Sequence, residues 1–238
     1  MAEISKVNAS VKTRLVGWLR EKVKKSGKKG IVIGISGGVD SSVVAALAAE
    51  AVTKKNILCL ILPCESSDED ASDAKMFAKS FGFNAKTIDL TPIYRTLIKS
   101  LPKGSKMARV NLKPRLRMLT IYYFANNLDY LVAGTGNKSE LSIGYFTKYG
   151  DGGVDILPLG DLYKSQVREL ARLLGIPEKI ITKPPTAGLW AGQTDEGEIG
   201  MTYDELEYRL RNKKYDAKLK RYTENAKHKL ILPEIFKI

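Results

Sequence analysis

The chain turns from strand to helix within the stretch Gly30-Ile-Val-Ile-Gly-Ile-Ser-Gly-Gly-Val-Asp-Ser-Ser42. Its first half is a short apolar run rich in β-branched residues, which is typical of a buried parallel strand. Two glycines then permit a tight turn, and a helix is expected to begin near Ser41. Backbone N–H groups at such a turn and helix start form a site for phosphate or pyrophosphate. Asp40 beside a phosphate suggests an intervening Mg²⁺, because like charges would otherwise repel.

Two other phosphate-binding patterns are excluded for this loop. It lacks the Gly-Lys-Ser/Thr ending of the Walker pattern, and it lacks the Gly-x-Gly-x-x-Gly spacing of dinucleotide-binding folds. The hydroxyls of Ser36, Ser41 and Ser42 add hydrogen-bond donors to the loop. On composition alone, the alternative to a phosphate-binding loop is an ordinary N-capped helix that follows a glycine turn.

Strand and helix patterns alternate along the rest of the chain. Apolar residues at helical spacing predict helices, and short β-branched runs predict strands. The predicted helices are 7–25, 41–52, 69–81, 93–101, 112–127 and 164–174, and the later strands are 56–62, 84–90 and 130–133. This order predicts a three-layer α/β/α fold with a mostly parallel sheet of about five strands. The tail 203–229 reads as basic C-terminal helix.

Two long segments interrupt the alternation. Residues 134–160 are rich in Gly, Thr and Asp, which indicates a functional loop. Residues 183–201 contain Pro184-Pro185, four glycines and an acidic patch, so this segment is expected to be mobile or ordered by a ligand. The sequence shows no internal repeat and no low-complexity linker, and residues 1–238 are predicted to form a single domain.

Composition limits the cellular context. The apolar runs 43–52 and 57–62 are too short to span a bilayer, so no membrane partner is expected. The first six residues lack an apolar signal-peptide core, which favours a cytoplasmic protein. The chain has two cysteines, Cys59 and Cys64, and one histidine, so neither a Cys/His zinc site nor a disulfide framework is expected.

The charge is strongly positive. The 238 residues include 39 Lys and Arg against 26 Asp and Glu, for a formal net charge of +13. Such an excess is compatible with nucleic acid, with phosphorylated small molecules or with a lysine-rich surface. Between residues 92 and 128 the chain has eight basic residues and no acidic one: Arg95, Lys99, Lys103, Lys106, Arg109, Lys113, Arg115 and Arg117.

Several motifs narrow the function. The Ser36–Ser42 loop resembles the pyrophosphate loop of the ATP pyrophosphatases. The further motifs, in chain order, are Asn111–Met118, Gly134–Glu140, Gly144–Asp155, Pro184–Trp190, Asp195–Leu206 and Glu224–Lys229. Together they resemble the ammonia-dependent NAD synthetase family over nearly the whole chain. The Gly134–Glu140 loop lacks the Thr-Asp-His-Ala-Ala-Glu wording of many bacterial members but keeps Thr135 and Glu140.

The resemblance implies a fold and a reaction. The fold would be that of the adenine nucleotide alpha hydrolases. The reaction would convert deamido-NAD, ATP and ammonia into NAD, AMP and pyrophosphate through an acyl-adenylate, with Mg²⁺ as cofactor and ATP as co-substrate. Stabilising charge at the α-phosphate and on the departing pyrophosphate would be the main catalytic task.

The resemblance also implies site residues. Those for ATP are Gly34, Ile35, Ser36, Gly37, Gly38, Val39, Asp40, Ser41, Thr135, Lys164 and Thr186. Those for deamido-NAD are Arg115, Lys148, Asp155, His228 and Lys229. Asp40 and Glu140 would bind Mg²⁺, and Lys164 would also be catalytic. We add the hypothesis that Asp151 holds or deprotonates ammonium.

Several of these assignments have a purely structural alternative. Without the family, Glu140 reads as an exposed acid at a helix start and Lys164 as a solvated lysine at another. Likewise, His228 reads as a tail histidine without a task and Asp151 as a turn residue. Arg117 lies two residues from Arg115, so on a helix the two are expected to point to different sides.

The resemblance further implies a homodimer with the dinucleotide site at the subunit interface. No glutaminase domain is expected, because Cys59 and Cys64 lie in and beside a buried strand, where packing is the favoured role. Two other functions share the loop or the sheet. A tRNA-modifying adenylase would suit the charge, but no RNA-binding appendage is visible, and nucleic acid is not the expected partner. A nucleotide sensor would not need both Asp40 and Glu140.

Overall fold

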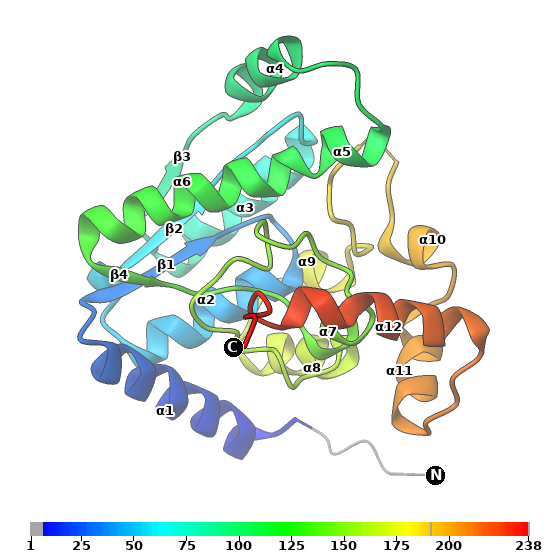
Figure 1. Cartoon of the computed structure of the whole chain (residues 1–238). Coiled ribbons are helices and arrows are strands. Elements are labelled where there is room, and N and C mark those ends of the chain that lie inside the picture. The colour runs from blue at the N-terminus through cyan, green and yellow to red at the C-terminus, as the bar shows by residue number, and fades with distance from the viewer. Residues whose placement is uncertain (1–6, 191, 238) are drawn as a thin grey trace.

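Four parallel strands form the sheet in the part of the chain that the structure describes, residues 7–190 and 192–237 of a computed structural model (Figure 1). The strands are β1 (Gly30–Gly34), β2 (Ile57–Ile61), β3 (Ala85–Thr87) and β4 (Tyr130–Val132), in the order β3-β2-β1-β4. Within the sheet, Ile31 of β1 pairs with Ile57 on one side and Leu131 on the other. Residues 1–6, which suggested the lack of a signal peptide, lie outside the described residues.

The sheet has one strand fewer than the five expected. After β4 the chain leaves the sheet and returns at Ile156, which meets Ala133 in a single parallel bridge. The chain between these two points forms the helix α7 (Lys138–Ile143) and then a glycine-rich turn around Gly150, Gly152 and Gly153. The return therefore touches the sheet edge without extending into a further strand. The three-layer arrangement itself is confirmed.

Helices cover both faces of the sheet (Figure 1). On one face lie α1 (Ala9–Ser26), α2 (Val39–Ala51), α3 (Asp68–Phe81), α8 (Lys164–Leu173) and α9 (Glu178–Thr182). On the other lie α4 (Thr91–Ser100) and α6 (Leu112–Leu128), with α5 (Lys106–Val110) between them in the chain. The short 3₁₀ helix η1 (Lys54–Asn56) joins α2 to β2. Another cluster forms around α7 (Lys138–Ile143), α10 (Asp195–Ile199), α11 (Tyr203–Arg211) and α12 (Ala217–Leu230).

The alternation of side chains along β1 divides the core. Ile31 and Ile33 belong to the cluster under α1 and α2, whereas Val32 belongs to the cluster under α6. All three are fully buried. Because both faces are covered, β1 and β2 are continuous apolar runs, as the sequence predicted for parallel strands.

The two cysteines are free and buried, one in the cluster on each face of the sheet. Burial raises the pKa of the Cys59 thiol to about 12 and also raises the pKa of Cys64. A thiol that stays protonated is a poor nucleophile. The structure thus agrees with the packing role expected for these residues.

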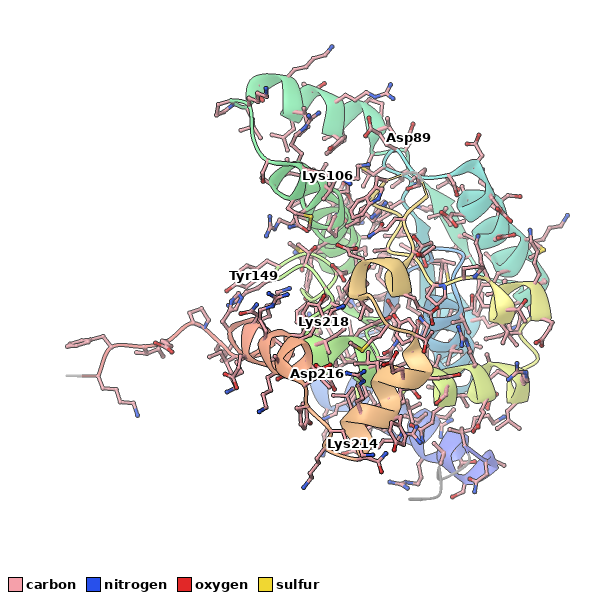
Figure 2. All side chains as sticks on the ribbon, turned by 90° about the vertical axis from the view of Figure 1, so that its right-hand side faces the viewer. Asp89, Lys106, Tyr149, Lys214, Asp216 and Lys218 are labelled. Carbon is pink, nitrogen blue, oxygen red and sulfur yellow. The ribbon has the colours of Figure 1, made fainter. Side chains whose placement is uncertain are left out.

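The C-terminal tail differs from the single helical segment expected over 203–229. Helix α11 ends at Arg211, and Lys213 adopts a left-handed conformation with φ 53°. Asp216, labelled in Figure 2 between Lys214 and Lys218, accepts a hydrogen bond from the Leu219 N–H at 2.8 Å and begins α12. The tail therefore folds as two helices joined by a turn.

Other element boundaries agree with the sequence to within a few residues. Helix α1 begins after Asn8, whose side chain accepts from the Val11 N–H. None of the helices in the described part of the chain is long and apolar enough to cross a membrane. The apolar runs 43–52 and 57–62 lie within or across α2 and β2, in the core.

Candidate active site

A cavity of about 590 Å³ opens where β1, β2 and β4 end. Loops at the carboxyl ends of parallel strands are the usual place for a ligand in open α/β sheets. The walls come from the loop after β1, the loop after β4, the start of α6, the segment 183–189, and the end of α12. Of the predicted site residues, all line the cavity except Gly37 and Asp155.

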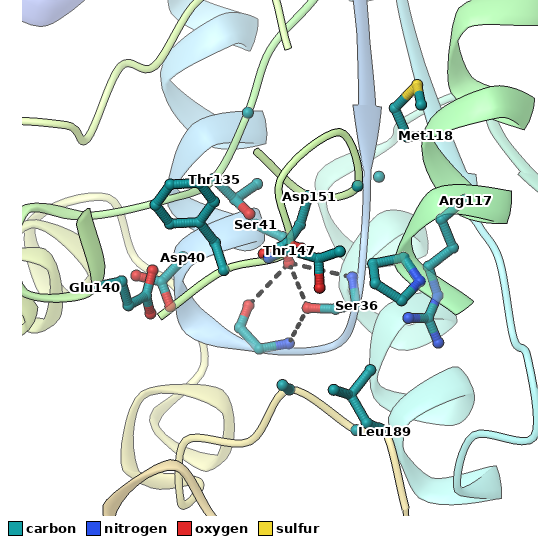
Figure 3. Close-up of a pocket in the computed structure, with 18 of the residues that line it drawn as sticks. Ser36, Asp40, Ser41, Arg117, Met118, Thr135, Glu140, Thr147, Asp151 and Leu189 are labelled. Atoms are coloured by element: carbon teal, nitrogen blue, oxygen red, sulfur yellow. Dashed lines mark hydrogen bonds between the residues drawn. The ribbon is translucent and has the colours of Figure 1, made fainter. Parts of the chain in front are cut away.

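The loop after β1 is braced from within. The Ser36 backbone N–H donates to Ser41 Oγ at 3.2 Å, and the Ser41 hydroxyl donates to the Gly38 carbonyl at 3.1 Å (Figure 3). No side chain caps the N-terminus of α2, so its first backbone N–H groups are available to a ligand. A helix start without a side-chain cap, after a glycine turn, is the arrangement that binds phosphate groups in other proteins.

Gly37 lies behind this loop, away from the cavity. Its φ is +83°, and a Cβ built there would lie 2.5 Å from the Asp70 carbonyl oxygen. Both facts exclude a side chain at this position. Gly37 therefore shapes the loop after β1 without lining the cavity.

Two carboxylates and one ammonium group meet at the end of the loop. Lys164, at the first position of α8, directly contacts Asp40 and lies 3.5 Å from a carboxylate oxygen of Glu140. Its side chain is only 4% exposed. The solvated-lysine interpretation of Lys164 is therefore wrong, and so is the exposed-acid interpretation of Glu140, whose side chain is 16% exposed.

Asn137 orients the two carboxylates. Its side-chain amide donates to Asp40 Oδ1 at 2.9 Å, and its backbone N–H donates to Glu140 Oε2 at 3.1 Å. In return the Glu140 N–H donates to Asn137 Oδ1, which completes a capping box at the start of α7. The Gly134–Glu140 loop is thereby tied to Asp40.

Burial and charge act against each other in this cluster. Burial raises the pKa of Glu140 to about 8, while Lys164 opposes this shift and Asp40 adds to it. For Lys164, burial alone would lower the pKa, but Asp40 and Glu140 outweigh it and raise the pKa. Lys164 therefore stays charged between the two acids.

The donor set fits a hard divalent cation. Within the described residues no group of three or more His, Cys, Asp or Glu is arranged as a complete metal site. Mg²⁺, however, commonly takes one or two carboxylates, with substrate phosphates and water completing its shell. Asp195 adds a third buried carboxylate nearby, and its Oδ1 has no hydrogen-bond partner among the described residues. Asp40 and Glu140 are thus compatible with the predicted Mg²⁺.

A basic wall forms on the other side of the cavity. Lys229 donates to the carbonyl oxygens of Gly144 and Phe146 at 2.6 and 2.8 Å, which fixes the end of α12 on the loop after α7. Lys148 contacts the His228 carbonyl, and Arg115 donates to the Lys148 carbonyl at 3.4 Å. The structure therefore brings Arg115, Lys148, His228 and Lys229 together from three segments.

Asp155 does not join this wall. One of its carboxylate oxygens accepts from the Tyr122 hydroxyl and the other from the Val132 N–H, both at 2.8 Å. These bonds hold the chain against β4 near the Ala133–Ile156 bridge. The structure thus gives Asp155 structural partners and places it outside the residues that line the cavity.

Asp151 lines the cavity (Figure 3). Its Oδ1 accepts from the Thr147 N–H at 2.9 Å. Surrounding protein raises the pKa of Asp151, and the Thr147 N–H, Arg117 and Lys229 partly offset that rise. Gly152 packs so tightly that a Cβ there would lie 2.5 Å from the Phe146 ring. The turn thus places the carboxylate in the cavity.

Sequence reasoning missed two features of the site. Arg115 and Arg117 point to different sides of the helix, as expected, toward Lys148 and Leu62 respectively, but both line the cavity. The cavity extends around the start of α6, and residues on different sides of that helix both reach it. Lys113 is buried behind the wall and donates to the Leu189 carbonyl at 2.8 Å. The sequence signal for Arg117 and Lys113 was the absence of acidic residues between 92 and 128.

The fold and the site define a nucleotide-dependent α/β enzyme with a pyrophosphate loop, a paired carboxylate site and a separate basic wall. The family model described as NAD synthase matches residues 11–235. The chain therefore belongs to the NAD synthase family, as its motifs indicated.

Individual relatives agree. The NH(3)-dependent NAD(+) synthetase of Carboxydothermus hydrogenoformans is 50% identical over 240 residues, covering 97% of this chain and 98% of that protein. Among solved structures, the NMN synthetase of Francisella tularensis matches with a TM-score of 0.90 at 37% identity, covering 96% of this chain and 98% of that one. The NH3-dependent NAD synthetase of Campylobacter jejuni matches with a TM-score of 0.79 at 30% identity and the same coverage. These similarities favour NAD synthesis over the tRNA-modifying and sensor alternatives.

Proposed function

We propose that this protein amidates deamido-NAD with ammonia at the expense of ATP, yielding NAD, AMP and pyrophosphate. The observation that carries the proposal is the contact of Lys164 with Asp40 and Glu140 beside the pyrophosphate loop. A site that only held a nucleotide would not need two buried carboxylates beside its phosphates. The family and its curated relatives support the same reaction.

The residues divide the first step between them. The nicotinate carboxylate attacks the α-phosphorus of ATP, and the bond to pyrophosphate breaks. Backbone N–H groups at the start of α2 and the Lys164 ammonium face the negative charge that leaves. Asp40 and Glu140 would hold Mg²⁺, which supplies positive charge to the phosphates when bound.

The second step releases the product. Ammonia attacks the acyl carbon of the adenylate, AMP leaves, and one proton must be removed from the nitrogen. We assign that proton to Asp151, because its carboxylate lines the cavity and surrounding protein raises its pKa. Arg115, Lys148, His228 and Lys229 would hold the dinucleotide. Thr135 and Thr186 line the same cavity and are assigned to ATP.

The nitrogen source of this domain is proposed to be ammonia. A glutaminase would need an accessible thiolate, whereas Cys59 and Cys64 are both fully buried.

The test is to incubate the protein with ATP, Mg²⁺, deamido-NAD and ammonium and to measure NAD and AMP. Equal amounts of both products support the proposal. AMP without NAD, or neither product, together with salt-sensitive binding of tRNA, would contradict it.

A mononucleotide substrate is the second candidate. It is favoured by the TM-score of 0.90 to a protein described as an NMN synthetase. The same assay with nicotinate mononucleotide in place of deamido-NAD separates the two. A higher kcat/KM with the mononucleotide would move the assignment to that substrate.

A homodimer through α6 is also proposed. Leu119 and Tyr123 lie on this helix with 64% and 68% of their surfaces exposed. Leu232, Ile235 and Phe236 follow α12 and are still more exposed, on a tail that extends away from the body (Figure 2). Such apolar exposure is typical of an interface. Light scattering should give twice the mass of one chain for the wild type, and Leu119→Glu with Tyr123→Glu should give one chain.

A further inference from the structure

Arg117 is a cation in the cavity wall without an acidic partner. Its Nε donates to the Leu62 carbonyl at 3.0 Å and its Nη2 donates to Ser66 Oγ at 3.1 Å. Both acceptors are neutral oxygens. Among the described residues Arg117 forms no ion pair with a carboxylate. The guanidinium is thus held in place by groups that leave its charge uncompensated.

Such a charge is unfavourable without a ligand. The Arg117 side chain is half-buried, and burial lowers its pKa. Asp151 and Asp70 oppose this shift from a distance. Buried charges in proteins are normally paired or bound to a ligand. Because Nη1 and part of Nη2 remain unused, Arg117 has donors to offer to a ligand in the cavity.

The position of Arg117 indicates which part of the substrate it contacts. Leu62 and Ser66 follow β2, whereas Ser36 and Asp40 follow β1. With pyrophosphate on the loop after β1, the nucleoside end of ATP must extend away from the acidic end at Lys164. The basic wall around Lys229 is assigned to the dinucleotide.

The remaining wall is suited to a nucleoside. It includes Leu60, Leu62, Pro63 and Leu189, which are apolar and suit a purine ring, and Arg117, which donates to the Leu62 carbonyl. Figure 3 draws Arg117 and Leu189 on the same side of Ser36. A planar guanidinium can both stack on a purine and donate to a phosphate.

We propose that Arg117 binds the AMP half of ATP and keeps hold of it in the acyl-adenylate until ammonia displaces it. The inference rests on the proposed function and adds a residue for which the family resemblance implied no role. Arg117 would thus bind the leaving nucleotide, while Arg115, two positions earlier, would bind the other substrate.

The test is direct binding, which does not depend on turnover. Isothermal titration of AMP, pyrophosphate and deamido-NAD is carried out on the wild type, Arg117→Met and Arg117→Lys, with Arg115→Met as the matched control. Arg117→Met should weaken the binding of AMP about tenfold or more, as expected for a lost charge-assisted hydrogen bond. Arg117→Lys should recover part of this loss. The affinities for pyrophosphate and deamido-NAD should change less than about twofold.

The control should show the reverse pattern. Arg115→Met should weaken deamido-NAD and leave AMP unchanged. If Arg117→Met does not fold, Ser66→Ala provides the second measurement, because it releases Nη2 and keeps the charge. Ser66→Ala should weaken the binding of AMP and leave the affinities for pyrophosphate and deamido-NAD unchanged, and an unchanged affinity for AMP would contradict the proposal.

Two outcomes would overturn the proposal. Unchanged AMP affinity with a lower melting temperature would make Arg117 a structural brace for the loop after β2. Weaker binding of deamido-NAD with unchanged binding of AMP would assign Arg117 to the dinucleotide. Either result leaves the proposed reaction intact, whereas a wild type that makes no NAD would refute the reaction and not the contact.

Discussion

Lys164 and Asp40 are in direct contact although 124 positions separate them in the chain. Lys164 is the first residue of α8 and Asp40 lies in the first turn of α2, so two helix starts meet across the cavity. A cation at a helix start is locally unfavourable. The direct contact with the Asp40 carboxylate provides the compensation.

Replacing Lys164 should affect stability and activity differently. Lys164→Met leaves two buried carboxylates without their cation, which should destabilise the metal-free protein by about 3–5 kcal/mol. Added Mg²⁺ should restore part of the melting temperature, because it takes the position of the lost charge. Activity should still fall by about 10²–10³-fold.

The comparison variant for Lys164 is Lys138→Met, whose ammonium pairs with the exposed Asp161. This variant should change stability little. Calorimetry with and without Mg²⁺ measures both effects. A Lys164→Met protein that Mg²⁺ does not stabilise would contradict the metal assignment of Asp40 and Glu140.

Glu140 should make the metal-free protein sensitive to pH. Its pKa is raised from 4.5 to about 8, so the folded state binds more protons than the unfolded state between these values. The free energy of unfolding should therefore fall as the pH rises through this window. Glu140→Gln should remove that fall, which urea denaturation at several pH values can measure. Identical pH profiles for the two proteins would show that Glu140 does not titrate in this window.

Asp151→Asn tests the handling of ammonia. Asparagine can still accept the hydrogen bond from the Thr147 N–H, so the turn should be retained. The KM for ammonium should rise about tenfold or kcat should fall, while the KM values for ATP and deamido-NAD stay the same. Asp161→Asn, at an exposed surface position, is the control. An unchanged rate and ammonium KM would refute the role of Asp151.

Gly37→Ala tests the shape of the pyrophosphate loop. Alanine at φ +83° is strained by about 1–3 kcal/mol, and its Cβ would meet the Asp70 carbonyl at 2.5 Å. Both the melting temperature and the affinity for ATP should fall. Gly17→Ala, in the middle of α1 with nothing within 4 Å of the new Cβ, should instead be neutral or stabilising by up to about 1 kcal/mol. Equal behaviour of the two variants would contradict this account of the loop.

Lys113 should hold the segment 183–189 in place. Its ammonium donates to the Leu189 carbonyl and lies 3.3 Å from a Glu65 carboxylate oxygen. Lys113→Met should destabilise the protein by about 1–3 kcal/mol, since a buried carbonyl loses its partner. Limited proteolysis should then cut near Leu189 faster than in Lys106→Met, whose ammonium lies over the Trp190 ring. Equal cleavage rates would show that Lys113 does not anchor this segment.

The sequence by itself determined the strand, loop and helix around Ser36, because each depends on neighbours within a few positions. It also predicted a phosphate site, and most of the residues predicted for the site line one cavity, since the motifs carry them. The four predicted strands and the main helices are present near their expected positions.

Only the tertiary structure decided which side chains meet. It brought Lys164 to Asp40, placed Arg117 in the cavity and gave Asp155 other partners. Spacing along one helix could not foresee Arg117, because the cavity surrounds the start of α6. The physical reason is that such contacts join segments far apart in the chain. Their geometry is set by the order of strands in the sheet and by which buried charges find a partner.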